Sequence, residues 1–126
     1  MQKHIYEYAV VRVVPLVERE EFVNVGVILF CKKQKFIHMR FQLREDRILA
    51  LKPDADLLEI KQNLEAFSKI ASGAKDGGPI ALLDEAERFR WLTAVRSASI
   101  QTSRPHPGVS DDLENAAEKL FDEMVA

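Results

Sequence analysis

The stretch Phe22-Val23-Asn24-Val25-Gly26-Val27-Ile28-Leu29-Phe30-Cys31 is the strongest β-strand signal in the chain. It is an almost unbroken run of β-branched, aromatic and aliphatic residues, the types that pack best on a pleated surface. Asn24 and Gly26 interrupt one of its faces. A glycine inside a strand marks a bulge or a close approach of another segment, and we interpret Gly26 as such a position. In the alternative interpretation, it leaves room for a ligand or for the ring of Trp91.

The segments on either side predict further strands of the same sheet. Residues 5–14 are rich in tyrosine and valine, and both of their faces are largely apolar, which is typical of a central strand or of one covered on both sides. Residues 36–43 alternate between apolar and polar types, as a half-buried strand does. The lysine-rich residues 32–35 form the turn that joins this strand to the opening stretch.

The turn sets the register of the hairpin and therefore its two faces. If it pairs Cys31 with Phe36, then Ile28 lies opposite Met39 and the apolar side chains of both strands share one face, which we expect to be the core side. We expect the opposite face to be partly wet or used for contact. It carries the polar side chains His38, Arg40 and Gln42.

Beyond residue 43 the hydrophobic period changes from about two to about 3.6, which predicts helices. We expect helices over residues 44–51 and 54–72, a third from Asp84, and a last one capped by Ser110 or Asp111. Asp56 with Glu59, and Asp84 with Glu87, have the spacing of a capping box. Before the last helix we expect a short strand over residues 98–102 and a stiff loop in which Pro105 and Pro107 bracket His106. Strands first and helices later predict an α+β fold, with an antiparallel sheet of three to four strands covered by about four helices. With 126 residues, we expect residues 1–126 to form a single domain.

The composition disfavours several classes of function. The 18 basic and 20 acidic side chains give a formal net charge of −2, so binding to nucleic acid is disfavoured. The single cysteine, Cys31, cannot form a disulfide within the chain, and the three histidines lie far apart, so we predict no metal and no cofactor. No apolar run is long enough to span a bilayer, and the N-terminus lacks the apolar core of a signal peptide. These features predict a cytoplasmic protein without membrane contact.

Trp91, the only tryptophan, stands on the unexpected side of the third helix. At helical spacing Phe89 and Leu92 fall on one side, and Trp91 falls almost opposite Phe89. A helix that packs one face on the core needs a second layer to cover a tryptophan on the other. In the first interpretation this layer is the chain's own residues 98–109. In the second, Trp91 is an anchor for a protein partner, since tryptophan and arginine are favoured at interface hot spots.

Arginines gather around the same helix. Arg88, Arg90 and Arg96 lie within one short segment, and Arg104 follows. The first interpretation is pairing on the helix surface, because Glu85 precedes Arg88 by three residues and Glu87 precedes Arg90 by three. The second is an anion site, because arginine forks suit phosphate and carboxylate groups. Its further members would be His106 with Ser97 or Ser103.

Four stretches together resemble one known family. They are residues 8–15, 21–31 and 87–94, with Arg96 and Ser97. The family is a bacterial one of small proteins, classed as a domain of unknown function and numbered three thousand and thirty-seven in that series. The resemblance spans nearly the whole chain and implies a bacterial, cytosolic protein, with no activity and no catalytic residues to carry over. It also implies a partner, a protein that resembles the HipA-type serine/threonine kinases.

Two hypotheses on function follow. The first is a non-enzymatic protein-interaction module, an accessory to a kinase-like partner, whose contact is formed by residues 91–96 and the loop around His106. The second is a small phosphate- or nucleotide-binding protein, or an enzyme, that uses Arg88, Arg90, Arg96 and His106. A homodimer is a further expectation, because an edge of the sheet, or the mixed face of residues 36–42, could pair with a second copy.

Overall fold

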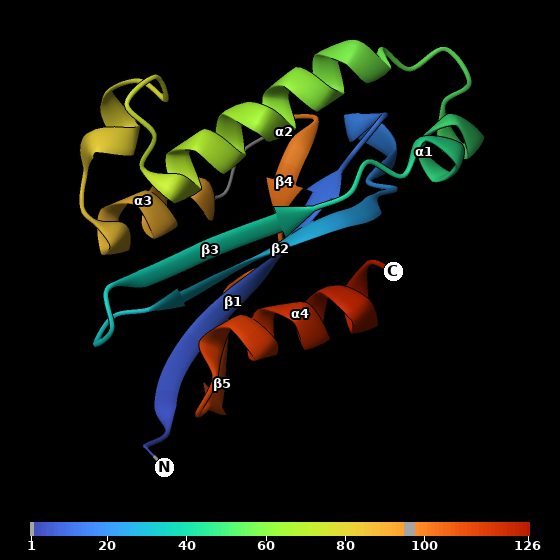
Figure 1. Cartoon of the computed structure of the whole chain (residues 1–126). Helices are drawn as coiled ribbons and strands as arrows, with labels where there is room; N and C mark the ends of the chain where they lie inside the picture. The colour runs from blue at the N-terminus through green and yellow to red at the C-terminus, as the bar shows by residue number, and fades with distance from the viewer. Residues whose placement is uncertain (1, 95–97) are drawn as a thin grey trace.

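The computed structural model of the chain describes residues 2–94 and 98–126 (Figure 1). The first half contains the strand β1 (His4–Val13), the 3-10 turn η1 (Val17–Arg19), the strands β2 (Val23–Cys31) and β3 (Phe36–Phe41), and the helices α1 (Glu45–Leu51) and α2 (Leu57–Ser72). The second half contains the 3-10 turn η2 (Pro79–Leu82), the helix α3 (Glu85–Leu92), the strands β4 (Ile100–Thr102) and β5 (His106–Ser110), and the helix α4 (Leu113–Met124).

The sheet is antiparallel, and β1 is its central strand. β2 pairs with one side of β1, and β3 lies outside β2. β4 and β5 both pair with the other side of β1, one after the other along its length. The predicted α+β fold is therefore confirmed, with five strands instead of three to four because this edge is divided. The predicted hairpin register is also confirmed, since Cys31 pairs with Phe36 and Ile28 with Met39.

A single hydroxyl bridges the division between β4 and β5. The Val10 amide donates to Ser103 Oγ at 2.9 Å, and the Ser103 amide donates to the Val10 carbonyl at 2.8 Å. The even-numbered residues at this end of β1 thus direct their backbone groups to the divided edge, because Val14 also donates to the Ser99 carbonyl. Hydrogen-bonded and non-hydrogen-bonded pairs alternate along an antiparallel ladder. Glu7 and its partner Pro107 therefore form a non-hydrogen-bonded pair, and their backbone N–H and C=O positions point away from each other.

This geometry corrects the prediction of a loop around His106. His106 begins strand β5 and pairs with Tyr8. The two prolines led to the prediction of a loop, but proline is compatible with an edge strand where its missing donor faces outward. Pro107 occupies such a position, so the ladder between β5 and β1 loses no hydrogen bond.

Helices cover both faces of the sheet. In Figure 1, α1, α2 and α3 lie over one face, and α4 lies over the other. The first face carries the larger core, which includes Val11, Ile28, Leu64 and Phe89. The second core joins one side of α4 to three buried β2 side chains, Val27, Leu29 and Cys31. β2 and the second half of β1 are largely buried between the two layers, as the two apolar faces of residues 5–14 predict, whereas the first half of β1 is partly exposed.

The helix starts follow their side-chain caps. Asp56 accepts from the Glu59 amide and Asp84 from the Glu87 amide, as predicted from the spacing. The last helix differs from the prediction, because its cap is Asp112, which accepts from the Asn115 amide at 3.0 Å. The hydroxyl of Ser110 instead bonds to the backbone of Asp112.

Gly26 and Asn24 have different structural roles within β2. A Cβ at Gly26 would lie 2.6 Å from the Arg40 carbonyl oxygen and 2.9 Å from Phe41 Cβ. The register between β1 and β2 also shifts beside it, so the interpretation as tight packing and a bulge is confirmed. Asn24 Nδ2 donates to the Met124 carbonyl at 3.2 Å and thereby holds the end of α4. Within residues 2–94 and 98–126, no helix has the length and hydrophobicity to cross a bilayer.

Candidate functional site

Trp91 lies on the outer side of α3, as its spacing predicts. Phe89 and Leu92 are buried in the larger core, whereas Trp91 is 37% exposed. The Phe89 ring stacks on that of Phe30, with ring centroids 5.0 Å apart. The Trp91 ring is tilted against that of Phe67 from α2, with ring centroids 6.2 Å apart. The two aromatic residues of α3 therefore contact different elements, Phe89 the strand β2 and Trp91 the helix α2.

A groove of about 310 Å³ adjoins the Trp91 ring. It is lined by residues of α2, α3 and the segment that leads into β4, namely Asn63, Ala66, Phe67, Ile70, Trp91, Ala98, Ser99 and Ile100. Self-covering of Trp91 is therefore only partial. Of residues 98–109, the first three line the groove, and α2 supplies the rest of the wall beside α3. The lining is mostly apolar, with the side chains of Asn63 and Ser99 as its polar groups.

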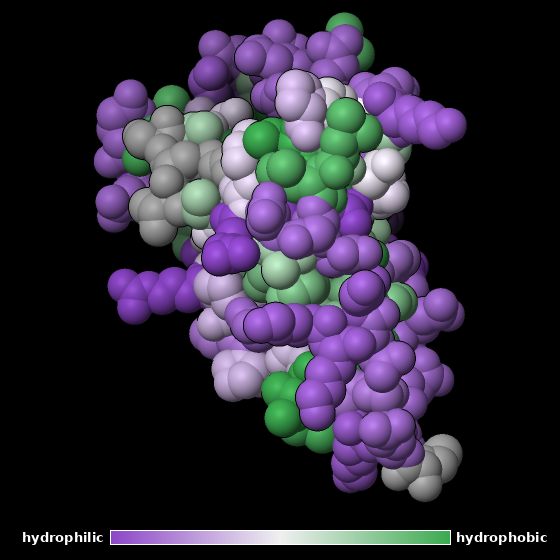
Figure 2. Space-filling model, turned by 90° about the vertical axis from the view of Figure 1, so that its left-hand side faces the viewer, coloured by the Kyte–Doolittle hydropathy of each residue, from purple (hydrophilic) through white to green (hydrophobic). Residues whose placement is uncertain are grey.

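Other exposed apolar residues lie outside this groove. Figure 2 shows the end of the molecule formed by η2, α3 and the β2–β3 turn, where hydrophobic surface occurs in separate groups among charged surface. Leu82 and Leu83 are exposed beside η2, and Ile5 and Val109 are exposed where β1 pairs with β5. Val109 and Ile5 line pockets that also carry charged side chains, whereas none of the described residues that line the Trp91 groove is charged.

Arg88 is a buried structural residue. It is 7% exposed, and its Nη1 donates to the carbonyls of Ile70 and Ala71 at 3.2 and 3.0 Å. These carbonyls belong to the last turn of α2, where the Ile70 carbonyl also accepts from the Gly73 amide at 3.2 Å. The carboxylate of Glu85 lies 4.0 Å away, so the predicted pairing on the helix surface is present, although Arg88 also reaches the end of another helix.

Among the described residues, the other predicted arginine and histidine positions do not gather around Arg88. Arg90 is exposed on α3, and Arg96 and Ser97 lie outside the described residues. His106 pairs with Tyr8, and their ring centroids lie 5.5 Å apart, on the face of the sheet that α4 covers. α3 packs on the opposite face. The described members of the predicted cluster therefore share no single anion pocket.

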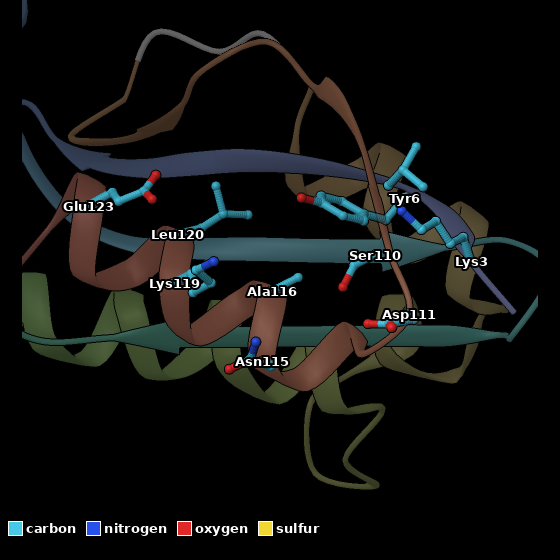
Figure 3. A pocket seen from close by; sticks show the side chains of 10 residues that line it. Lys3, Tyr6, Ser110, Asp111, Asn115, Ala116, Lys119, Leu120 and Glu123 are labelled. Atoms are coloured by element: carbon cyan, nitrogen blue, oxygen red, sulfur yellow. The ribbon is translucent and has the colours of Figure 1, made fainter. Parts of the chain in front are cut away.

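A polar cleft that the sequence did not predict lies between α4 and the β1–β5 ribbon (Figure 3). Its volume is about 380 Å³. The charged and polar side chains around it are Lys3, Tyr6, Ser110, Asp111, Asn115, Lys119 and Glu123. Two lysines and two carboxylates leave it balanced in formal charge. It joins residues 3–6 to residues 109–123, and no local spacing in the sequence indicates such a long-range contact.

Tyr6 is the aromatic residue of this cleft. Its ring lies across Gly108, where any Cβ would collide with it. In Figure 3, its hydroxyl points along the cleft toward Leu120 and Glu123. Burial raises the pKa of Tyr6 above 10.0, and Tyr8 and Glu123 raise it further. The phenol therefore stays protonated at neutral pH, where it can donate a hydrogen bond but does not act as a base.

Among the residues that the structure describes, no three His, Cys, Asp or Glu side chains gather in a way that could hold a metal ion. Cys31 is fully buried in the smaller core. A thiol in that setting is shielded from substrates and packs as a small hydrophobic residue.

Comparison with known proteins gives one match. The family described as "Protein of unknown function (DUF3037)" matches residues 8–125. Neither the curated proteins nor the solved structures include a match to the chain. The matched range extends from β1 to the end of α4 and includes both cores, so the resemblance noted from the sequence is confirmed. The chain belongs to the DUF3037 family.

Proposed function

We propose that the chain is a non-enzymatic protein-binding module of the bacterial cytosol and that the Trp91 groove is its docking site. The observation that carries the proposal is the position of Trp91, which is part of a concave apolar surface while its neighbours Phe89 and Leu92 are in the core. A half-exposed tryptophan in such a surface is the residue type that most often dominates binding at protein interfaces.

The lining of the groove favours a protein partner over a small polar ligand. Small-molecule sites combine apolar walls with a few converging polar or charged groups. Among the described lining residues, the polar groups are those of Asn63 and Ser99, and none of these residues is charged. The occupant that fits this chemistry is one aliphatic or aromatic side chain of a partner, seated between Trp91 and α2.

The docking surface differs from the contact expected from the sequence. That contact combined residues 91–96 with the segment around His106, but His106 lies on the other face of the sheet. A single flat partner surface would not reach both faces. The proposed site is therefore confined to α2, α3 and residues 98–100. A protein that resembles the HipA-type kinases is the partner to test first.

The proposal is tested by measuring how tightly the Trp91→Ala variant binds that partner. Truncation of a central anchor should weaken binding by about 2 kcal/mol, or about 30-fold in Kd, as measured by titration calorimetry. Leu82→Ala is the matched control, because Leu82 is 72% exposed and lies outside the groove. A second variant, Ala66→Glu, keeps Trp91 and places a charge in the groove, and it should weaken binding as well.

Two outcomes would contradict the docking site. One is a partner that binds Trp91→Ala and Ala66→Glu as tightly as the unaltered chain. The other is binding without any change in the fluorescence of Trp91, the only tryptophan, since an occupant of the groove must alter the environment of its ring. Circular dichroism of each variant separates a loss of binding from a loss of fold.

A further inference from the structure

The outer edge of β3 presents a regular row of backbone groups. The Gln42 amide donates to the Val25 carbonyl at 2.7 Å, so Gln42 directs its backbone toward β2. Successive residues of a strand alternate in direction, and the register of β3 with β2 is continuous. The backbone N–H and C=O groups of Ile37, Met39 and Phe41 therefore point away from β2. Among the described strands, none pairs with this edge.

The two edges of the sheet differ in their protection against pairing. The opposite edge is divided at Ser103, and Pro107 on β5 lacks a donor where its backbone faces outward. Proline and interruptions are the usual devices that prevent strand addition at an edge. β3 contains neither a proline nor an interruption over its six residues, Phe36–Phe41. In Figure 1 it is the strand nearest the viewer, with α2 above it and α4 below.

The side chains of β3 are compatible with pairing to an identical strand. Ile37, Met39 and Phe41 are only partly buried, although all three pack against the larger core. In an antiparallel pair centred on Met39, Met39 faces its own copy and Ile37 faces Phe41 of the second copy. Every apolar side chain of this face thus meets another apolar side chain.

The other face of β3 places no uncompensated charge at this contact. Arg40 forms an ion pair with Glu118, and its guanidinium lies 4.2 Å from the centre of the Phe121 ring, so α4 already holds this cation. In the same register, Arg40 faces His38 of the second copy. An exposed edge guarded by unpaired lysines would repel its copy, whereas the lysines of this hairpin lie in the turn, residues 32–35.

We propose that β3 pairs antiparallel with β3 of a second copy, about a two-fold axis at Met39, and continues the sheet through a homodimer. Self-pairing of this kind gives the same contacts to both partners, as a two-fold interface requires. The Trp91 groove is lined by residues from α2, α3 and the start of β4 rather than from β3. The dimer is thus independent of the proposed docking function, and each can fail without the other.

Amide hydrogen exchange on the unaltered chain gives the first test. The amides of His38 and Arg40 bond within the chain and should exchange slowly at every concentration. The Met39 amide bonds only across the proposed axis. Its exchange should be slow at concentrations well above the dimer dissociation constant and fast on dilution below it. Fast exchange of Met39 in a sample shown to be dimeric would overturn the proposal.

Oligomeric state in solution gives the second test. Light scattering should show twice the mass of one chain for the unaltered protein and for Val109→Pro, which removes an outward donor from the opposite edge. Met39→Pro removes the donor at the axis, and Met39→Lys places two charges there, so both should be monomeric. Circular dichroism checks that each variant is folded. If Met39→Pro does not fold, the result for Met39→Lys decides the test. A monomeric unaltered chain, or a dimer that survives Met39→Lys, would overturn the proposal.

Discussion

At the scale of single residues, Arg88 shows how a charged side chain can complete the backbone of a distant helix. It connects α3 to the last turn of α2 through two carbonyls. Gly73, which ends α2 with a positive φ of 68°, lies against it, and a Cβ there would stand 2.6 Å from Nη1. The spacing of Glu85 and Arg88 predicted their pairing. Ile70, whose carbonyl accepts one of these bonds, lies 18 residues before Arg88 in the sequence, so no local pattern predicts the contact.

Substitution of Arg88 should therefore affect stability. Arg88→Met keeps most of the apolar stem but removes the donor to the Ala71 carbonyl and one of the two donors to the Ile70 carbonyl. We expect the free energy of unfolding to fall by about 1–3 kcal/mol in urea denaturation. Arg90→Met, on the exposed side of the same helix, should change it by less than about 0.5 kcal/mol. Equal effects of the two substitutions would contradict the structural role of Arg88.

Tyr6 gives a prediction on pH. Its pKa is raised above 10.0, first by burial and then by Tyr8 and Glu123. The unfolded chain therefore releases this proton at a lower pH than the folded chain. The stabilisation is complete below pH 10.0 and is lost as the pH rises through the folded-state pKa. Tyr6→Phe should lose less stability than the unaltered chain between neutral and strongly alkaline pH, as measured by urea midpoints. Parallel pH profiles would contradict this assignment.

At the scale of elements, hydrophobic period and capping spacing were sufficient to predict most helices and strands. The cap residues Asp56 and Asp84 were identified correctly because each precedes a glutamate by three residues. The start of α4 was misplaced, since Ser110, Asp111 and Asp112 are all good caps and only the path of the chain decides among them. β5 was missed because proline in an edge strand cannot be distinguished from proline in a loop without the position of its partner.

The start of α4 can be tested with two adjacent aspartates. Asp112→Ala removes the acceptor for the Asn115 amide and should lower the free energy of unfolding by about 1 kcal/mol. Asp111→Ala should change it by less than about 0.5 kcal/mol, because Asp111 is exposed and does not accept the capping bond. A larger loss in Asp111→Ala, measured by thermal and urea denaturation, would show that the helix begins one residue earlier.

At the scale of the whole molecule, the strands β1 and β2 contribute to both cores. The larger core lies under α2 and α3, and the smaller one lies under α4. Position in the sequence alone could not assign α4 to the opposite face, because the apolar stripe of a helix does not show which face of the sheet it covers. For the same reason, the Trp91 groove was only half anticipated. The exposed side of Trp91 follows from helical spacing, whereas its wall from α2 depends on tertiary packing.

The shared strands predict that the two layers unfold together. Trp91 and Cys31 are the single tryptophan and the single cysteine, and they lie in different layers. Leu64→Ala, in the larger core, should lower the free energy of unfolding by about 2–5 kcal/mol. Trp91 fluorescence and Cys31 thiol reactivity should report the same lowered urea midpoint. Separate midpoints would indicate two independent units and contradict the expectation of a single domain.

The divided edge of β1 has a consequence for the order of assembly. Val10 on β1 finds its partner in Ser103, 93 residues later in the chain. During synthesis, β1 can pair with β2 as soon as the first hairpin has formed, but its other side waits for the last quarter of the polypeptide. Contacts of such long separation slow folding and leave a strand edge open to other nascent chains. Shielding of β1 by a chaperone until residues 100–110 emerge would therefore raise the yield of folded protein.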